Sequence, residues 1–319
     1  MRKSKILKKG ILCSVREETI PNILVIMSTY NGEKYLCEQL DSILKQKGVN
    51  VSVLIRDDGS TDATVTLLKR YCSEHSNVSF YDGMNIGVVK SFNHLMMNHQ
   101  LDDFKWIAFA DQDDVWEEKK LIRGISLLEM YEEIPGLYCS NLQVVDSALN
   151  KICMMHVKKP MFNKFTAVVQ NCATGCTCVF NQKALEVYRK GIKSRMEMHD
   201  YWMFLVCVYF GVVVYDKAAY IKYRQHAKNV VGVSKKNILK ALRNIIKIDC
   251  GKREKMLKDF LSVYSSNLDC RSRKILLPLI TYKTSVISRL KLIFSPCYHG
   301  YSINVTFGFK LRAILGKIY

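Results

Sequence analysis

Trp106-Ile107-Ala108-Phe109-Ala110-Asp111-Gln112-Asp113-Asp114-Val115-Trp116 joins an apolar run directly to three carboxylates within four positions. The five mostly apolar residues predict a buried strand. Carboxylates this close repel one another, so a site that holds all three requires a cation. Oxygen ligands at the end of a buried strand suit Mg²⁺ or Mn²⁺. This stretch therefore predicts a divalent metal site, and such an ion usually serves a phosphate or diphosphate.

Upstream of this stretch, short apolar runs alternate with segments whose apolar residues have the spacing of a helix. We expect strands at 22–28, 49–55, 78–81 and 106–110, and helices at 33–47, from 61, at 88–97 and at 117–131, with Ser60 or Thr61 capping the second helix. This order predicts an α/β fold with a mostly parallel sheet flanked by helices. Three strand ends carry polar turns, at 28–31, 57–60 and 111–114. Ligands of parallel sheets bind beyond such ends, so we expect the site there.

Beyond residue 136 the pattern is mixed. It predicts strands at 137–145 and 176–180, a helix that opens at 198–202, and short strands at 211–215 and 219–223. The longest apolar run, Tyr201–Tyr215, has 15 residues and is too short for a membrane span, which needs about 20. The composition changes near Ser234, so we divide the chain into a basic lead-in (1–21), a body (22–234) and a basic helical C-terminal region (235–319).

The positive charge lies at the two ends of the chain. Residues 1–21 carry six Lys and Arg against two Asp and Glu, and residues 235–319 carry 18 against four. The body carries 24 against 23. Apolar positions from Ile238 to Ile246 share one helical face, which predicts a basic amphipathic helix at an anionic membrane surface or one that is docked on the body. No signature of a nucleic-acid-binding fold accompanies the charge.

Twelve cysteines are present, but the N-terminus has no long apolar segment of the secretory type. We therefore expect free, mostly buried thiols in a reducing cytosol. Cys172, Cys176 and Cys178 match no common zinc spacing, and we expect them in the core.

Taken together and in order, these motifs resemble family 2 glycosyltransferases with the GT-A fold. The resemblance covers residues 22–232. It rests on Ser28-Thr29-Tyr30-Asn31-Gly32, Asp57-Asp58-Gly59-Ser60-Thr61-Asp62, Asn85-Ile86-Gly87, Ala110–Trp116 and His199-Asp200-Tyr201-Trp202. The acidic motif, the His-Asp-Tyr-Trp motif and Tyr223-Arg224-Gln225-His226 are similar to the rhamnosyltransferase-like subgroup of bacterial polysaccharide synthesis.

The resemblance implies a role for each matched residue. Thr29, Tyr30, Asp57 and Asp58 would hold the donor nucleotide, although Asp57 and Asp58 could instead cap the next helix. Asp113 would bind the metal, Asp111 would face the ribose or the metal, and Asp114 would assist or cap the next helix. His226 would complete the metal site or be structural, and Arg224 would hold the diphosphate. Asn171, Thr174 and Gly175 would shape the sugar pocket.

Asp200 matches the catalytic base of the family, with an N-cap as the structural alternative. The resemblance thus implies an inverting, Mn²⁺- or Mg²⁺-dependent glycosyl transfer. We expect dTDP-L-rhamnose as the donor, or else a UDP-hexose. The acceptor would be a saccharide, often lipid-linked, at the inner face of the cell membrane. A nucleotidyltransferase would need a Gly-rich phosphate loop that residues 28–32 do not form. A non-catalytic basic membrane-binding protein would not need acids at three strand ends.

Overall fold

The computed structural model describes residues 20–225 and 251–318. The strands are β1 (Asn22–Thr29), β2 (Asn50–Asp57), β3 (Val78–Asp82), β4 (Trp106–Ala110), β5 (Val115–Trp116), β6 (Gly136–Val145), β7 (Lys151–Met154), β8 (Val179–Asn181) and β9 (Val212–Arg224). The helices before β9 are α1 (Leu36–Leu44), α2 (Thr64–Glu74), α3 (Val88–Met96), α4 (Lys120–Leu128), α5 (Lys164–Ala167), α6 (Gln182–Lys190) and α7 (His199–Phe210). After it come α9 (Lys252–Val263), α10 (Cys270–Thr281), α11 (Val286–Phe294) and α12 (Ile303–Ile314), and short 3₁₀ turns η1 (His99–Asp103), η2 (Glu129–Tyr131) and η3 (Gly175–Thr177) connect other elements.

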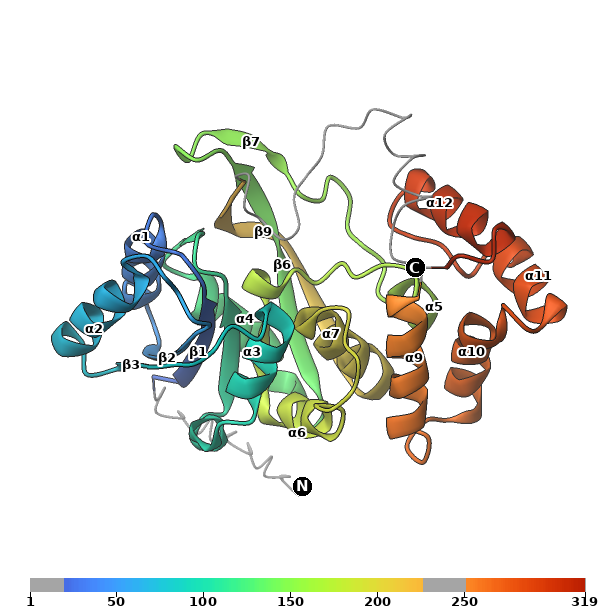
Figure 1. Ribbon diagram of the computed structural model, residues 1–319, viewed down its shortest axis with the longest axis horizontal. Helices are drawn as coiled ribbons and strands as arrows, with labels where there is room; N and C mark the ends of the chain where they lie inside the picture. Colours follow the sequence, from blue (N-terminus) through green and yellow to red (C-terminus); the bar gives the residue numbers. More distant parts are fainter. Residues whose placement is uncertain (1–19, 226–250, 319) are drawn as a thin grey trace, which may run out of the picture.

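Within the described residues, nine strands form one mixed sheet in the order β3-β2-β1-β4-β8-β6-β9-β5, with β7 paired to β6. The strands β3, β2, β1 and β4 are mutually parallel, as the alternation of strands and helices predicts. β8 runs antiparallel to β4 and β6, while β9 runs parallel to β6. The parallel half therefore places the ends of β1, β2 and β4 at one edge of the sheet (Figure 1).

The two faces of the sheet are buried in two separate cores, because successive side chains of a strand point to opposite faces. Ile23, Val25 and Met27 pack in the core under α1, α2 and α4. Leu24 and Ile26 pack in the other core, which α3, α6 and α7 cover. Burial on both faces explains why these strands are continuous apolar runs rather than alternating ones.

The C-terminal helices extend the second core away from the sheet. Met256, Phe260 and Leu276 from α9 and α10 are fully buried in the same cluster as α7. In Figure 1 these helices lie beside α7 at the end of the molecule opposite α1 and α2. No helix among the described residues is long and apolar enough to cross a membrane. The predicted helix around 238–247 and the boundary near Ser234 lie outside the described residues.

Three local predictions are wrong. Residues 176–180 are not one strand, because η3 occupies Gly175–Thr177 and β8 begins at Val179. The strands predicted at 211–215 and 219–223 form a single strand, β9, whose pairing with β6 is irregular after Asp216. α2 begins three residues later than predicted, and Asp62, rather than Ser60 or Thr61, accepts the first backbone N–H of the helix, that of Thr64. The ten described cysteines are free thiols, as predicted.

Candidate active site

A cavity of about 400 Å³ opens at the edge where β1, β2 and β4 end. Strand register aligns these ends, since Thr29 pairs with Asp57 and Met27 pairs with Ala110. The polar and charged residues of the cavity wall come from seven segments of the chain: Ser28, Tyr30, Asp58, Asn85, Asp111, Gln112, Asp113, Thr174, His199, Asp200 and Tyr223. The predicted convergence of the three polar strand ends is therefore confirmed.

Asp58 lines the cavity and holds the turn at residues 85–87, which also lies in the cavity wall. Its carboxylate forms a buried ion pair with Arg56. It also accepts the backbone N–H groups of Ile86 at 3.0 Å and Gly87 at 2.8 Å. Asp58 thus anchors the Asn-Ile-Gly turn to the end of β2, and Arg56 balances its charge.

Thr29 and Asp57 do not reach the cavity. Both are fully buried. The Thr29 hydroxyl donates to Asp57 at 2.8 Å, and the backbone N–H and hydroxyl of Ser60 donate to the same carboxylate at 2.8 and 2.6 Å. These two residues stabilise the turn after β2, and the structure does not bring them into the cavity wall.

Tyr30 lines the cavity and is about half exposed. Its backbone is held by Gln112, which accepts from the Tyr30 N–H at 2.8 Å and donates to the Tyr30 carbonyl at 3.1 Å. This amide joins the loop after β1 to the acidic loop after β4. The sequence carried little sign of the role, because Gln112 and Tyr30 are 82 positions apart.

The acidic loop presents Asp111 and Asp113 to the cavity and turns Asp114 inward. Burial, followed by the charges of Asp113 and Asp200, raises the pKa of Asp111 to about 7. Burial, followed by Asp111 and Asp113, raises the pKa of Asp114 well above its usual value. A cation is the group that relieves such a cluster.

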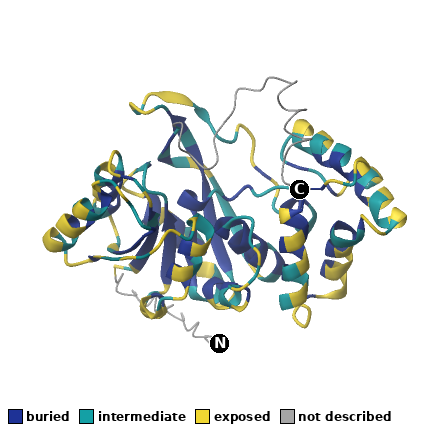
Figure 2. Cartoon of the chain, in the orientation of Figure 1, coloured by how far each residue is buried: buried dark blue, intermediate teal, exposed yellow. Residues whose placement is uncertain are grey.

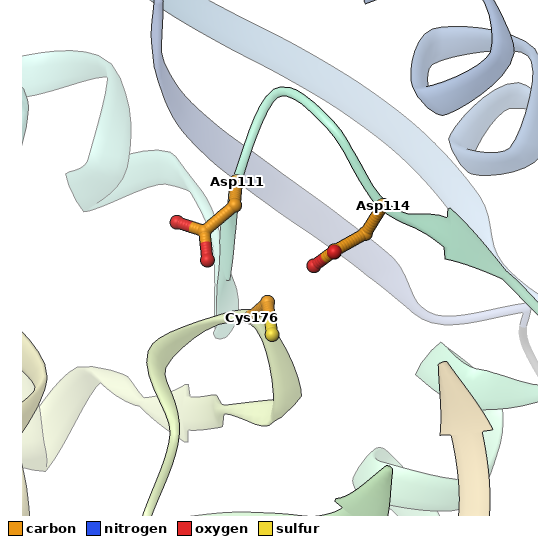
Figure 3. A group of neighbouring side chains, drawn as sticks. All are labelled: Asp111, Asp114 and Cys176. Carbon is orange, nitrogen blue, oxygen red and sulfur yellow. The ribbon is translucent and has the colours of Figure 1, made fainter. Parts of the chain in front are cut away.

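Asp114 does not cap the next helix, because α4 begins after Lys119. One of its oxygens accepts the Arg224 backbone N–H at 3.1 Å, while Oδ2 makes no hydrogen bond with the described residues. Ligand atoms of Asp111, Asp114 and Cys176 lie within 4.8 Å of one another. Figure 3 shows the two carboxylates at either side of the loop, with Cys176 facing them from η3.

Arg224 lies behind the acidic loop and is buried. Its guanidinium donates to the Asp113 carbonyl at 2.9 Å and to the Ser147 carbonyl at 2.6 Å, and it forms an ion pair with Glu38. It is not part of the cavity wall. The structure therefore gives Arg224 a role in holding the loop and does not bring it to a diphosphate site in the cavity. His226 lies outside the described residues.

Asp200 enters the cavity from the first turn of α7, whose N-cap is Met198, so Asp200 is not the cap. Its Oδ2 accepts the Gly175 N–H at 2.9 Å, and its Oδ1 makes no hydrogen bond with the described residues. Burial raises the pKa of Asp200 to about 6, partly offset by the backbone N–H groups of Gly175 and Tyr201. One oxygen is therefore held in place and the other is available to take a proton.

His199 is the neighbour of Asp200 and also lines the cavity. Its ring stacks on Phe92 with centroids 3.8 Å apart and meets the edge of Phe109 at 4.8 Å. Neither ring nitrogen has a hydrogen-bond partner among the described residues. Burial lowers the pKa of His199 to about 3, so the imidazole is neutral near pH 7.

Thr174 and Gly175 line the cavity, while Asn171 is not part of its wall and lowers the pKa of Asp200 through its side chain. A Cβ at position 175 would lie 3.3 Å from His199 Nε2 and 3.4 Å from Asp200 Oδ2. Glycine is thus the residue that lets η3 approach the acid closely.

Comparison with known proteins agrees with this geometry. The family model for glycosyl transferase family 2 matches residues 24–189, more than half of the chain. The dTDP-rhamnosyl transferase RfbG of Shigella flexneri is 29% identical over 219 residues, which cover 65% of this chain and 74% of that protein. The putative glycosyltransferase EpsE of Bacillus subtilis is 33% identical over 113 residues, 35% of this chain and 40% of that protein.

Among solved structures, S. aureus TarS 1-349 in complex with UDP-GlcNAc superposes with a TM-score of 0.53 at 15% identity, over 93% of both chains. This likeness concerns the fold, which is that of the GT-A glycosyltransferases. The matched residues include the ends of β1, β2 and β4 and most of the residues that line the cavity. The chain therefore belongs to glycosyl transferase family 2, has the GT-A fold and is a nucleotide-sugar-dependent glycosyltransferase.

Proposed function

We propose that this enzyme transfers L-rhamnose from dTDP-L-rhamnose to a saccharide hydroxyl with inversion at the anomeric carbon. The choice of donor rests on the similarity to RfbG, a dTDP-rhamnosyl transferase. A UDP-hexose is the alternative, since TarS, which shares the fold, was solved with UDP-GlcNAc. We place the reaction in the synthesis of a cell-surface polysaccharide, on a lipid-linked acceptor at the inner membrane face.

The observation that carries the proposal is that one cavity holds both a candidate base and an acidic cluster. Asp200 offers a carboxylate oxygen without a partner among the described residues, and Asp111 and Asp113 line the same cavity. A base together with a cluster that favours a bound cation is what displacement of a nucleoside diphosphate by a hydroxyl needs.

The residues present fit a hard divalent cation. The repulsion that raises the pKa of Asp111 is relieved by positive charge, and carboxylate oxygens are ligands that Mg²⁺ and Mn²⁺ prefer. Asp111 and Asp113 would hold the ion on the cavity side. When bound, it neutralises the charge that develops on the leaving diphosphate. The thiol of Cys176 is a soft ligand that does not add to the affinity for Mg²⁺.

In the proposed reaction, Tyr30 and Asp58 hold the donor and Asp200 takes the proton. Tyr30 lies against the nucleotide base, and Asp58 fixes the turn below it. The acceptor hydroxyl gives its proton to Oδ1 of Asp200 while its oxygen forms the new bond to the anomeric carbon. The bond from that carbon to the diphosphate oxygen breaks, and the electron pair leaves with the nucleoside diphosphate. The gain from such a positioned base is typically about 10²–10⁴-fold.

The test is calorimetric titration of the enzyme with dTDP-L-rhamnose, UDP-N-acetylglucosamine and GDP-mannose in the presence of Mn²⁺. We expect dTDP-L-rhamnose to bind most tightly. Tighter binding of the UDP-sugar would show that the donor is a UDP-hexose rather than dTDP-L-rhamnose. Binding of none of the three nucleotide sugars would refute the proposal.

The metal is tested separately with Mn²⁺ alone, followed by electron paramagnetic resonance. Asp113→Ala should lose the bound Mn²⁺ signal, whereas Asp103→Ala, at an exposed acid, should retain it. Equal Mn²⁺ binding by the two variants would remove Asp113 from the metal site.

A further inference from the structure

The last two described helices expose large apolar side chains. Ile287 and Phe294 of α11 are 80% and 76% exposed, and Ile303 and Phe307 of α12 are 84% and 64% exposed. Val286 and Leu290 of α11 and Ile314 of α12 are also exposed. Both helices lie at the outer edge of the molecule, away from the sheet (Figure 2). Such a concentration of exposed apolar surface indicates an interaction site.

The exposed apolar residues of each helix fall on one stripe. In α11 they follow the spacing 286, 287, 290, 294, and in α12 the spacing 303, 307, 314, which recur on one side of a 3.6-residue helix. The opposite sides carry Leu292 and Phe309, which are fully buried in the protein core. Each helix is thus apolar toward the protein and apolar toward solvent, which folding of the described chain does not explain.

The charge of this region identifies the partner. Residues 270–319 contain nine Lys and Arg and no Asp or Glu. Lys291 and Lys317 are exposed on or beside the two helices. A second copy of the chain, docked through the same face, would bring together two surfaces of the same sign, which is unfavourable. Apolar stripes flanked by basic side chains are the pattern of helices that lie in the surface of an anionic membrane.

A basic cavity adjoins the start of α12. It measures about 360 Å³, and its wall includes Lys158, Lys159, Lys217 and His156 but no acid. Tyr301, which precedes α12, accepts the Lys158 backbone N–H at 2.6 Å, and its ring lies 4.9 Å from that of His156. If α12 rests on a bilayer, cations at this place would lie close to the phosphates of the lipid headgroups.

We propose that the face formed by α11 and α12 docks on an anionic phospholipid bilayer. The apolar stripes enter the boundary between headgroups and acyl chains, and the exposed Lys291 and Lys317 contact lipid phosphates. This inference deepens the membrane-side location proposed above and rests on that part of the proposed function. It is independent of the donor sugar and of the proton transfer at Asp200.

The experiment is co-sedimentation of the full chain with vesicles of phosphatidylcholine alone or mixed with phosphatidylglycerol. We expect binding to the mixed vesicles, weaker binding at high salt because the attraction is screened, and little binding to phosphatidylcholine. The double variant Ile287→Asp, Phe294→Asp should bind the mixed vesicles at least about tenfold more weakly, because two apolar side chains that would enter the bilayer are replaced by charged ones. Met130→Asp changes an equally exposed apolar residue on the body and should bind like the wild type.

Each outcome decides the proposal. No binding of the wild-type chain to anionic vesicles would refute it, and so would full binding by the double variant, which would assign the contact to another segment. A wild-type dimer that the double variant dissociates would assign the face to a second copy instead. Calorimetric binding of the nucleotide sugar by the same variant tests the proposed function separately, since the donor site contains none of these residues.

Discussion

The two carboxylates at the end of β2, Asp57 and Asp58, differ from the His199-Asp200 pair that opens α7 in how the protein satisfies their polar atoms. Asp57 and Asp58 accept hydrogen bonds from hydroxyl and backbone groups, and Asp58 has the Arg56 cation beside it. One carboxylate oxygen of Asp200 has no hydrogen-bond partner among the described residues. The same holds for both ring nitrogens of His199. Unsatisfied buried polar atoms cost stability, about 1–3 kcal/mol each. We infer that the satisfied acids shape the site and the unsatisfied groups meet the substrate.

The largest expected effect is that of Asp200→Asn. The amide keeps an oxygen for the Gly175 N–H but cannot take a proton, so kcat should fall by about 10²–10⁴-fold. Nucleotide-sugar affinity should stay close to that of the wild type. Single-turnover kinetics and calorimetry measure the two quantities.

The matched control is Asp103→Asn, at an exposed acid, which should retain full activity. Turnover of Asp200→Asn at the wild-type rate would remove Asp200 as the base.

Asp57→Ala tests the opposite side of the comparison. It leaves the Thr29 hydroxyl and the Ser60 N–H without their acceptor, so the free energy of unfolding should fall by about 1–3 kcal/mol. At saturating donor, kcat should change by less than about threefold, because the residue does not reach the cavity.

Chemical denaturation measures the loss, and Asp82→Ala, at an exposed acid, should change the unfolding free energy by less than about 0.5 kcal/mol. If Asp57→Ala had the stability of the wild type but no longer bound the donor, Asp57 would instead be assigned to the nucleotide-binding site.

His199→Phe should have the reverse pattern. Phenylalanine keeps the stacking on Phe92 and removes two unsatisfied nitrogens, so stability should hold or rise. If these nitrogens meet substrate, kcat/KM should fall by about tenfold, the effect of one lost hydrogen bond. Thermal unfolding and steady-state kinetics separate the two effects. An unchanged kcat/KM would show that the unsatisfied imidazole has no part in binding.

The smallest effect is the pH dependence. Since burial raises the pKa of Asp200 to about 6, the base is protonated below this value and ionised above it. The rate should therefore rise with pH through about 6 and fall about tenfold per unit below it. His199 has a pKa lowered to about 3, so its titration cannot cause the change of rate near pH 6. The variant His199→Phe should therefore show the same dependence on pH. The residual activity of Asp200→Asn should lack it.

The sequence predicted the parallel half of the sheet and the meeting of its polar ends, because apolar runs and turn residues are local signals. The directions of side chains within the site were not predictable in the same way. Arg224 points behind the acidic loop because it pairs with Glu38, which is 186 positions away. Asp57 and Asp58 are adjacent in sequence, yet only Asp58 reaches the cavity. Cys176 lies in a 3₁₀ turn although its neighbours alternate as a strand does, since contacts with the acidic loop outweigh the local pattern.

The turn at Gly175 limits which parts of the cavity can change when the enzyme evolves to accept a different sugar. Its N–H positions Asp200, its backbone forms part of the cavity wall, and any side chain at 175 would press on His199 and Asp200. A change in this turn that admits a different sugar would also displace the group that takes the proton. Related enzymes that acquire new donors should therefore keep this turn and vary other parts of the wall, such as Val88.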